Sequence, residues 1–271
     1  MKKLLIATVF AASVFGGNAQ EAAEKNIQAG LALGTGVIFT NTETELIDRR
    51  GIGASQVVGM NLEWHFKPNI AFSTGLEFDF DRYRYTFNDS VYVDYNDKDI
   101  LRKRDAIAQR NTLLMEQRRT RTTYATIPTM LRFQTNFLGY FRYFGRFGLR
   151  NSFLLSSRAD IDGHIINEDN QVGEERELDD MILSRDVSFY KGSAGLSGGA
   201  EWNFSGGTSL IGELGYYLGF TNIHSGDRSI GDPDNNKSIY SSSDLSDMEN
   251  RNYRVAAARQ GLLLLKVSLL F

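Results

Sequence analysis

Apolar and polar residues alternate along most of the chain from residue 27 onward, which is the pattern of a β-strand with two different faces. The clearest run sets Leu62, Trp64 and Phe66 against Glu63 and His65. Eight segments show this alternation: 27–39, 58–66, 70–80, 123–134, 140–157, 189–204, 210–220 and about 254–271. The pattern therefore predicts an all-β protein.

The connections between these segments are alternately short and long. Tight turns follow the second, fourth and sixth segments, at 67–69, 136–139 and 205–207. The other connections are long and polar, at 41–53, 87–122, 158–188 and 222–253. Because outer-membrane barrels have short periplasmic turns and long external loops, we predict an eight-stranded, antiparallel, up-and-down transmembrane β-barrel.

The glycines indicate which face of each strand points inward. In a narrow barrel the interior is crowded, and glycine there leaves room for long charged side chains, whereas glycine on a solvent face only weakens a strand. We therefore expect the polar face to line the interior and the apolar face to meet lipid. The alternative is a soluble, exported lipocalin-like carrier, whose apolar face would turn inward. These glycines share the parity of the charged residues: Gly30, Gly34, Gly36, Gly59, Gly75, Gly148, Gly195, Gly199, Gly215 and Gly219.

The charges on the predicted inner face are sorted by strand, so that acidic strands neighbour basic ones. Buried charges need partners, because removing one partner costs about 3–5 kcal/mol. We therefore predict an ion-pair network that plugs the barrel, and we favour it over an ion-selective pore because eight strands leave an interior filled by side chains. The predicted network is Glu63, Glu77, Asp79, Asp81, Arg132, Arg142, Arg146, Arg150, Glu201, Glu213 and Lys266.

The first residues have the form of a secretory signal peptide. Lys2 and Lys3 precede an apolar run from 4 to 15, and Gly17 and Ala19 are the small residues of a cleavage site. We expect cleavage after Ala19 and one barrel domain over 20–271, in the outer membrane of a Gram-negative cell. The chain has no cysteine, which excludes disulfides, thiolate metal sites and lipoprotein processing, and its net charge of −3 argues against nucleic-acid binding.

Three segments resemble a known family. Residues 124–133, from Tyr124 through Ile127-Pro128 to Leu131-Arg132-Phe133, resemble the "Y-x-x-I-P-x-x-L-K-F" strand of PorT-like outer-membrane barrels. Residues 192–223 are similar to that family's Gly-rich strand and "Y-x-x-G-L-x-N-I" hairpin, and the terminal Phe271 resembles the aromatic signal read by the barrel-insertion machinery. The resemblance implies an eight-stranded outer-membrane barrel with a role in protein secretion, because the founding member supports protease export by the type IX system.

The long connections carry the surface on which we expect partners to bind. Within 87–122, apolar residues recur at helical spacing beside a basic patch, which predicts an amphipathic helix. This helix would either lie on the phosphates of lipopolysaccharide or pack on the acidic connection that carries Glu168, Asp169, Glu174, Glu175, Glu177, Asp179 and Asp180. The basic patch is Arg102, Lys103, Arg104, Arg110, Arg118, Arg119 and Arg121.

Catalytic chemistry has little support in the sequence. His224-Ser225 with Asp227 suggests a barrel enzyme acting on lipid or peptide, but neighbouring positions of one loop rarely assemble a triad. Residues 232–236 have oxygen ligands without the spacing of a calcium loop. We therefore predict no cofactor, no metal and no enzymatic activity. The expected function is a barrel whose external loops bind envelope lipid, a secretion-system partner or an external ligand.

Overall fold

The computed structural model describes residues 27–42, 47–49, 52–101, 111–167, 169–183, 186–205, 207–224, 237–242, 251–254 and 258–271. Within them the chain forms 13 strands. No helix in these ranges is long and apolar enough to cross a bilayer. The strands are β1 (Ile27–Thr42), β2 (Ile47–Arg49), β3 (Gly53–Lys67), β4 (Ile70–Asn96), β5 (Asp99–Ile100), β6 (Asn111–Gln134), β7 (Phe141–Ile166), β8 (Val172–Ile182), β9 (Tyr190–Ser205), β10 (Thr208–Gly219), β11 (Ile239–Ser241), β12 (Asn252–Arg254) and β13 (Ala258–Leu270).

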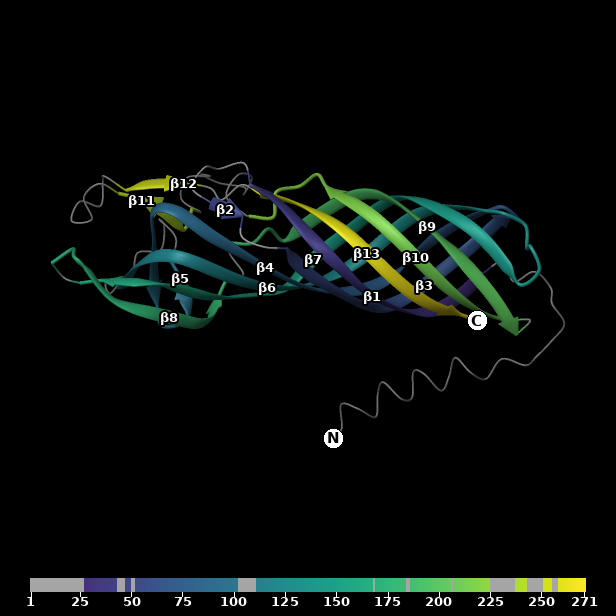
Figure 1. Cartoon of the computed structure of the whole chain (residues 1–271), viewed down its shortest axis with the longest axis horizontal. Coiled ribbons are helices and arrows are strands. Elements are labelled where there is room, and N and C mark those ends of the chain that lie inside the picture. The colour runs from purple at the N-terminus through teal and green to yellow at the C-terminus, as the bar shows by residue number, and fades with distance from the viewer. Residues whose placement is uncertain are drawn as a thin grey trace, which may run out of the picture.

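The long strands pair in a closed ring. Following the antiparallel pairs of the described residues from β1 leads through β3, β4, β6, β7, β9, β10 and β13 and back to β1. These strands run obliquely around the right half of the molecule in Figure 1, with the C-terminus at the right end. Seven of the eight segments predicted from sequence coincide with one strand of this ring, apart from single residues at their ends. The last, about 254–271, begins on β12, and its described remainder lies on β13. The remaining five strands lie in segments expected to be loops.

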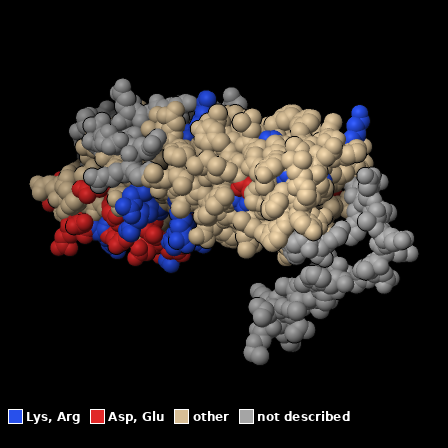
Figure 2. Space-filling model, turned by 45° about the vertical axis from the view of Figure 1, so that its right-hand side comes forward, with Lys and Arg blue, Asp and Glu red and all other residues tan. Residues whose placement is uncertain are grey.

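The two faces of the ring have opposite character. Leu33 and Leu196 on the outer face are 65 % and 68 % exposed, whereas Glu63 and Arg132 on the inner face are fully buried. The predicted orientation of the faces is therefore confirmed, and the apolar interior expected of a soluble lipocalin-like carrier is contradicted for these described residues. Figure 2 shows the consequence: the barrel half is almost entirely tan, and charged side chains gather at the other end.

Pro128 lies inside β6 without ending it. A proline in a strand predicts a bulge or a strand end, because it has no N–H to donate. The strand instead continues past Pro128, which pairs with Arg150 of β7. On the β4 side the recorded pairs stop at Thr74 and resume at Glu77, so the missing donor interrupts this ladder opposite Gly75 and Leu76.

Strands β4, β6 and β7 continue well beyond the ring and build a second unit, which we call the extension. The sequence predicted loops at 87–122 and 158–188, with a helix in the first. This is wrong for the described residues, which are mostly strands. β8 pairs with β7, and β5 joins β4 and β8 (Figure 1). Like β5, the strands β2 and β11 pair with the edge of β4 opposite β6.

The extension has a hydrophobic core of its own. On β4, the apolar residues of the ring point outward, at Leu76, Phe78 and Phe80. Beyond Asp81 the apolar positions change parity, and Tyr83 and Tyr85 point inward. Such a change is expected where a strand passes from lipid to water, because the apolar side of the strand then turns from the surroundings to the interior. The buried cluster includes Tyr83, Tyr85, Phe87, Val91, Val93, Leu113, Met115, Ile161, Leu178 and Met181.

Candidate functional site

Charged side chains fill the ring and contact one another from strand to strand. Near the short turns, the Arg142 Nε donates to Glu201 Oε2 at 2.7 Å. Arg132 bridges Glu201 and Glu63, and Glu63 also accepts from Arg146. Arg132 therefore lies between carboxylates of two other strands and Arg142 contacts one, which offsets the cost of removing these groups from water.

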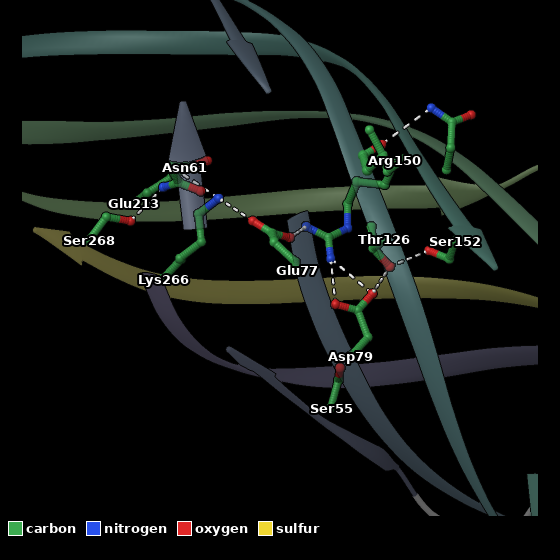
Figure 3. A network of polar contacts seen from close by, with 12 residues as sticks. Ser55, Asn61, Glu77, Asp79, Thr126, Arg150, Ser152, Glu213, Lys266 and Ser268 are labelled. Atoms are coloured by element: carbon green, nitrogen blue, oxygen red, sulfur yellow. Dashed lines mark hydrogen bonds and ion pairs between the residues drawn. The ribbon is translucent and has the colours of Figure 1, made fainter. Parts of the chain in front are cut away.

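The same alternation of charge continues toward the extension (Figure 3). Arg146 contacts Glu213, and the Lys266 Nζ lies 3.8 Å from Glu213 Oε2 and 3.1 Å from Glu77 Oε1. Arg150 then bridges Glu77 at 2.5 Å and Asp79 at 2.9 Å. From Arg142 to Asp79, the contacts form one unbroken chain of alternating charge along the interior.

Asp81 contacts a charged residue, Lys191, that was not among the predicted network residues. Its Oδ2 lies 2.6 Å from the Nζ of Lys191, and its Oδ1 accepts from Ser55 at 2.6 Å. The 11 predicted residues hold six carboxylates and five cations. Lys191 supplies the sixth cation, so the network described here is neutral. Its position on the polar face of the 189–204 segment was the available signal.

Little space remains between the side chains of the network. Phe144 lies under two guanidinium groups, 4.3 Å from that of Arg132 and 4.7 Å from that of Arg146. The cavity bordered by Asp79, Asp81 and Lys191 holds about 20 Å³, which is room for about one water molecule. A wider cavity of about 390 Å³ opens at the end with the short turns, beside His65 and Phe66.

The histidine suggested as catalytic is buried in the extension. His224 is 3 % exposed, and its Nε2 lies 3.2 Å from the Tyr85 hydroxyl. Its Nδ1 lies 3.8 Å from Asp186, which accepts from Arg118 at 2.8 Å and from Ser238 at 2.7 Å. Burial, with Arg118 nearby, lowers the pKa of His224 to about 4. Ser225, Asp227 and 232–236 lie outside the described residues.

The predicted basic patch does not lie on a helix. Arg102, Lys103, Arg104 and Arg110 lie outside the described residues, whereas Arg118, Arg119 and Arg121 are on strand β6. Arg118 points inward to Asp186. Arg119 and Arg121 point outward, where Arg119 contacts Glu177 and the Arg121 Nη2 lies 3.6 Å from Asp180 Oδ1. Two residues of the acidic connection, Glu177 and Asp180, thus contact the basic patch.

The chain end at Phe271 lies against a neighbouring strand. Phe271 follows β13, and its amide donates to the Ala29 carbonyl at 2.9 Å, so the chain end is held on the neighbouring strand. Its role in insertion stays a prediction. Among the described residues, no three His, Asp or Glu side chains are grouped to hold a metal ion. The predicted signal peptide at 1–19 lies outside the described residues.

Solved structures of outer-membrane proteins are similar to this chain at low identity. Neisserial surface protein A is 11 % identical, with 89 % of this chain and 95 % of its own covered and a TM-score of 0.33. Ail of Yersinia pestis is 11 % identical, with coverages of 90 % and 98 % and a TM-score of 0.31. The Escherichia coli outer membrane protease OmpT is 10 % identical, with coverages of 92 % and 97 % and a TM-score of 0.30.

No curated protein matches the sequence significantly. A protein-family model, however, matches the chain. The model described as "Outer membrane protein beta-barrel domain" matches residues 18–225, which is most of the chain and includes the strands from β1 to β10. The alternation of outward apolar and inward charged residues is the pattern of such proteins. The chain therefore belongs to this family of outer membrane β-barrel proteins of Gram-negative cells.

Proposed function

We propose that this protein is a non-enzymatic, eight-stranded outer-membrane barrel with a plugged interior, which holds the extension at the cell surface as a binding platform. The observation that carries the proposal is the unbroken neutral network from Arg142 to Asp79. An ion crossing the barrel would have to separate buried ion pairs, each of which is costly to break. Function is then left to the external surface, as is usual for residues carried on a rigid scaffold.

The surroundings of His224 support a structural role for this residue. A general base must reach substrate and accept a proton near the working pH. His224 is buried inside the extension, and its lowered pKa leaves it a weak base. Replacing His224 with alanine is therefore expected to leave the lipid A profile in mass spectrometry unchanged. A changed profile would favour the alternative of a surface enzyme.

The PorT-like motifs support a finer proposal, that the platform serves protein secretion and contacts a secretion-system partner. Deleting the gene is expected to reduce secreted proteases in the medium, and the intact chain is expected to restore them. An unchanged set of secreted proteins would refute the secretion role while leaving the plugged barrel untouched.

Conductance of the purified protein in planar lipid bilayers tests the plug. The wild-type barrel is expected to show no steady channel. Replacing Arg146 and Glu213 with alanine removes two bulky charged side chains, and we expect discrete conducting events from this variant. Replacing the outward Arg176 with alanine is the control. Steady conductance from the wild-type protein would contradict the proposal.

A further inference from the structure

Five arginines lie on the outer face of the extension, directly above the lipid-facing band. Strand pairing places Arg82 of β4 opposite Arg121 of β6, and Arg121 opposite Arg158 of β7. In the next row, Arg84 lies opposite Arg119. Three strands thus present arginines side by side to the outside. Like charges directly opposite each other destabilise a sheet, so this arrangement favours a bound anion.

The carboxylates of the extension do not neutralise all five arginines. Asp160 lies 2.8 Å from Arg121, and Asp180 lies 3.5 Å from Arg158. These acids belong to β7 and β8, on one side of the cluster. On the other side, Arg82 and Arg84 are exposed on β4, and neither forms an ion pair within the described part of the chain.

An open groove runs between the two sides of this cluster. It encloses about 620 Å³ and is lined by Arg82, Arg84, Arg119 and Arg121, with Asp160 as the one carboxylate among its described lining residues. Guanidinium groups bind phosphate with two parallel N–H donors, which makes such a groove suited to phosphate esters. Ile52 and Ala54 add apolar surface at its border.

The level of the groove identifies the source of the phosphate. Phe80, which is 45 % exposed, precedes Arg82 by two residues on the same face of β4. Two residues of a strand span about 7 Å, so the arginine row lies one headgroup depth above the lipid-facing side chains. The phosphates nearest to this level are those of the outer-leaflet glycolipid.

We propose that the groove formed by Arg82, Arg84, Arg119 and Arg121 binds the phosphate groups of lipid A. This inference rests on the proposed function, because it requires the extension to lie outside the cell. It differs from the helix predicted from sequence, since the site is a strand surface and includes two arginines of β4. The acidic strand β8 then orients Arg119 and Arg121 and does not occupy the groove.

Binding of lipid A to the full mature barrel in detergent micelles tests the proposal, with dephosphorylated lipid A, inorganic phosphate and heparin as further probes. We expect wild-type protein to bind lipid A, and the double variant Arg82→Gln, Arg84→Gln to bind it at least tenfold more weakly. Arg176→Gln removes an exposed charge from β8, outside the groove, and is the matched control. Affinity is also expected to fall with added salt.

Several results would overturn the assignment. If dephosphorylated lipid A bound as tightly as lipid A, or if the double variant kept the wild-type affinity, the arginines would not be the phosphate-binding groups. Binding of heparin or free phosphate without lipid A would assign the groove to a soluble anion. Conductance of the same preparations in planar bilayers separates this inference from the proposed function. A wild-type barrel that shows no channel and does not bind lipid A would refute the inference and leave the proposed function standing.

Discussion

At the scale of single residues, charge balance decides what the interior of the barrel tolerates. Lys191 is the partner of Asp81 and lies 4.2 Å from the ring of Tyr124. Replacing Lys191 with methionine leaves a buried carboxylate with only the Ser55 hydroxyl. We expect the free energy of unfolding in lipid vesicles to fall by about 3 kcal/mol in urea titrations. Adding Asp81→Asn is expected to recover most of this loss, and an additive double variant would contradict the pairing.

The space around the backbone also restricts which residues the barrel interior accepts. A Cβ added at Gly199 would lie 2.1 Å from the Gly212 carbonyl oxygen and 2.8 Å from the Phe144 ring, whereas one added at Gly212 would meet nothing within 4 Å. Gly199→Ala is therefore expected to destabilise the barrel by about 1–3 kcal/mol in the same urea titrations. Gly212→Ala, on the outer face of the neighbouring strand, is the control and is expected to be nearly neutral. Similar losses in both variants would contradict the inward placement of Gly199.

At the scale of elements, the extension depends on the buried contacts of His224. Burial and Arg118 lower the pKa of His224 to about 4 from an ordinary value of 6.5. Burial raises the pKa of Asp186, but Arg118 and His224 outweigh it and hold this pKa below its ordinary value of 3.8. As the pH falls, the unfolded state therefore binds more protons than the folded state, first at the histidine and then at the carboxylate.

We expect the extension to lose stability as the pH falls from about 6.5 to 4. The Ile223 amide donates to the Ala258 carbonyl at 3.0 Å, and its hydrogen exchange reports opening of this region. The protection of this amide, measured as its exchange rate relative to the intrinsic rate at each pH, is expected to fall over this pH range in the wild type. It is expected to change much less in His224→Gln, which has no titrating group at this position. Identical pH profiles would show that His224 does not control the opening.

The ring strands could be predicted from sequence, but the extension could not. Strands such as 58–66 have one continuous parity, so alternation alone identifies them. On β4 the apolar parity changes between Phe80 and Tyr83, and a search for one continuous pattern ends the strand there. This change of parity was visible in the sequence. It is the pattern expected where a strand passes from lipid to water.

The candidate site was predicted in part for a similar reason. Inward charges such as Arg132 lie on regular strands, so parity alone places them. Their partners depend on strand tilt and register, which no single strand encodes, and Lys191 was missed as the partner of Asp81. Arg82 and Arg84 were overlooked because the predicted strand ended before them.

At the scale of the whole molecule, the change of parity divides the chain into a lipid-facing barrel and a water-facing extension. The two units share β4, β6 and β7, so the extension is held upright by strands anchored in the membrane (Figure 1). Three strands that run through both units hold the outer face of the extension in a fixed position above the barrel, as the proposed phosphate groove requires.

Cysteine reporters test this arrangement directly, because the chain has no native cysteine. Asp169→Cys, at the turn between β7 and β8, is expected to react with a membrane-impermeant maleimide on intact cells. Asn136→Cys, in a short turn, is expected to react only after the outer membrane is permeabilised. Leu76→Cys, on the lipid-facing side of β4, is expected to resist the reagent in both states. Labelling of position 136 before position 169 would reverse the orientation, and with it the placement of the arginines at the cell surface.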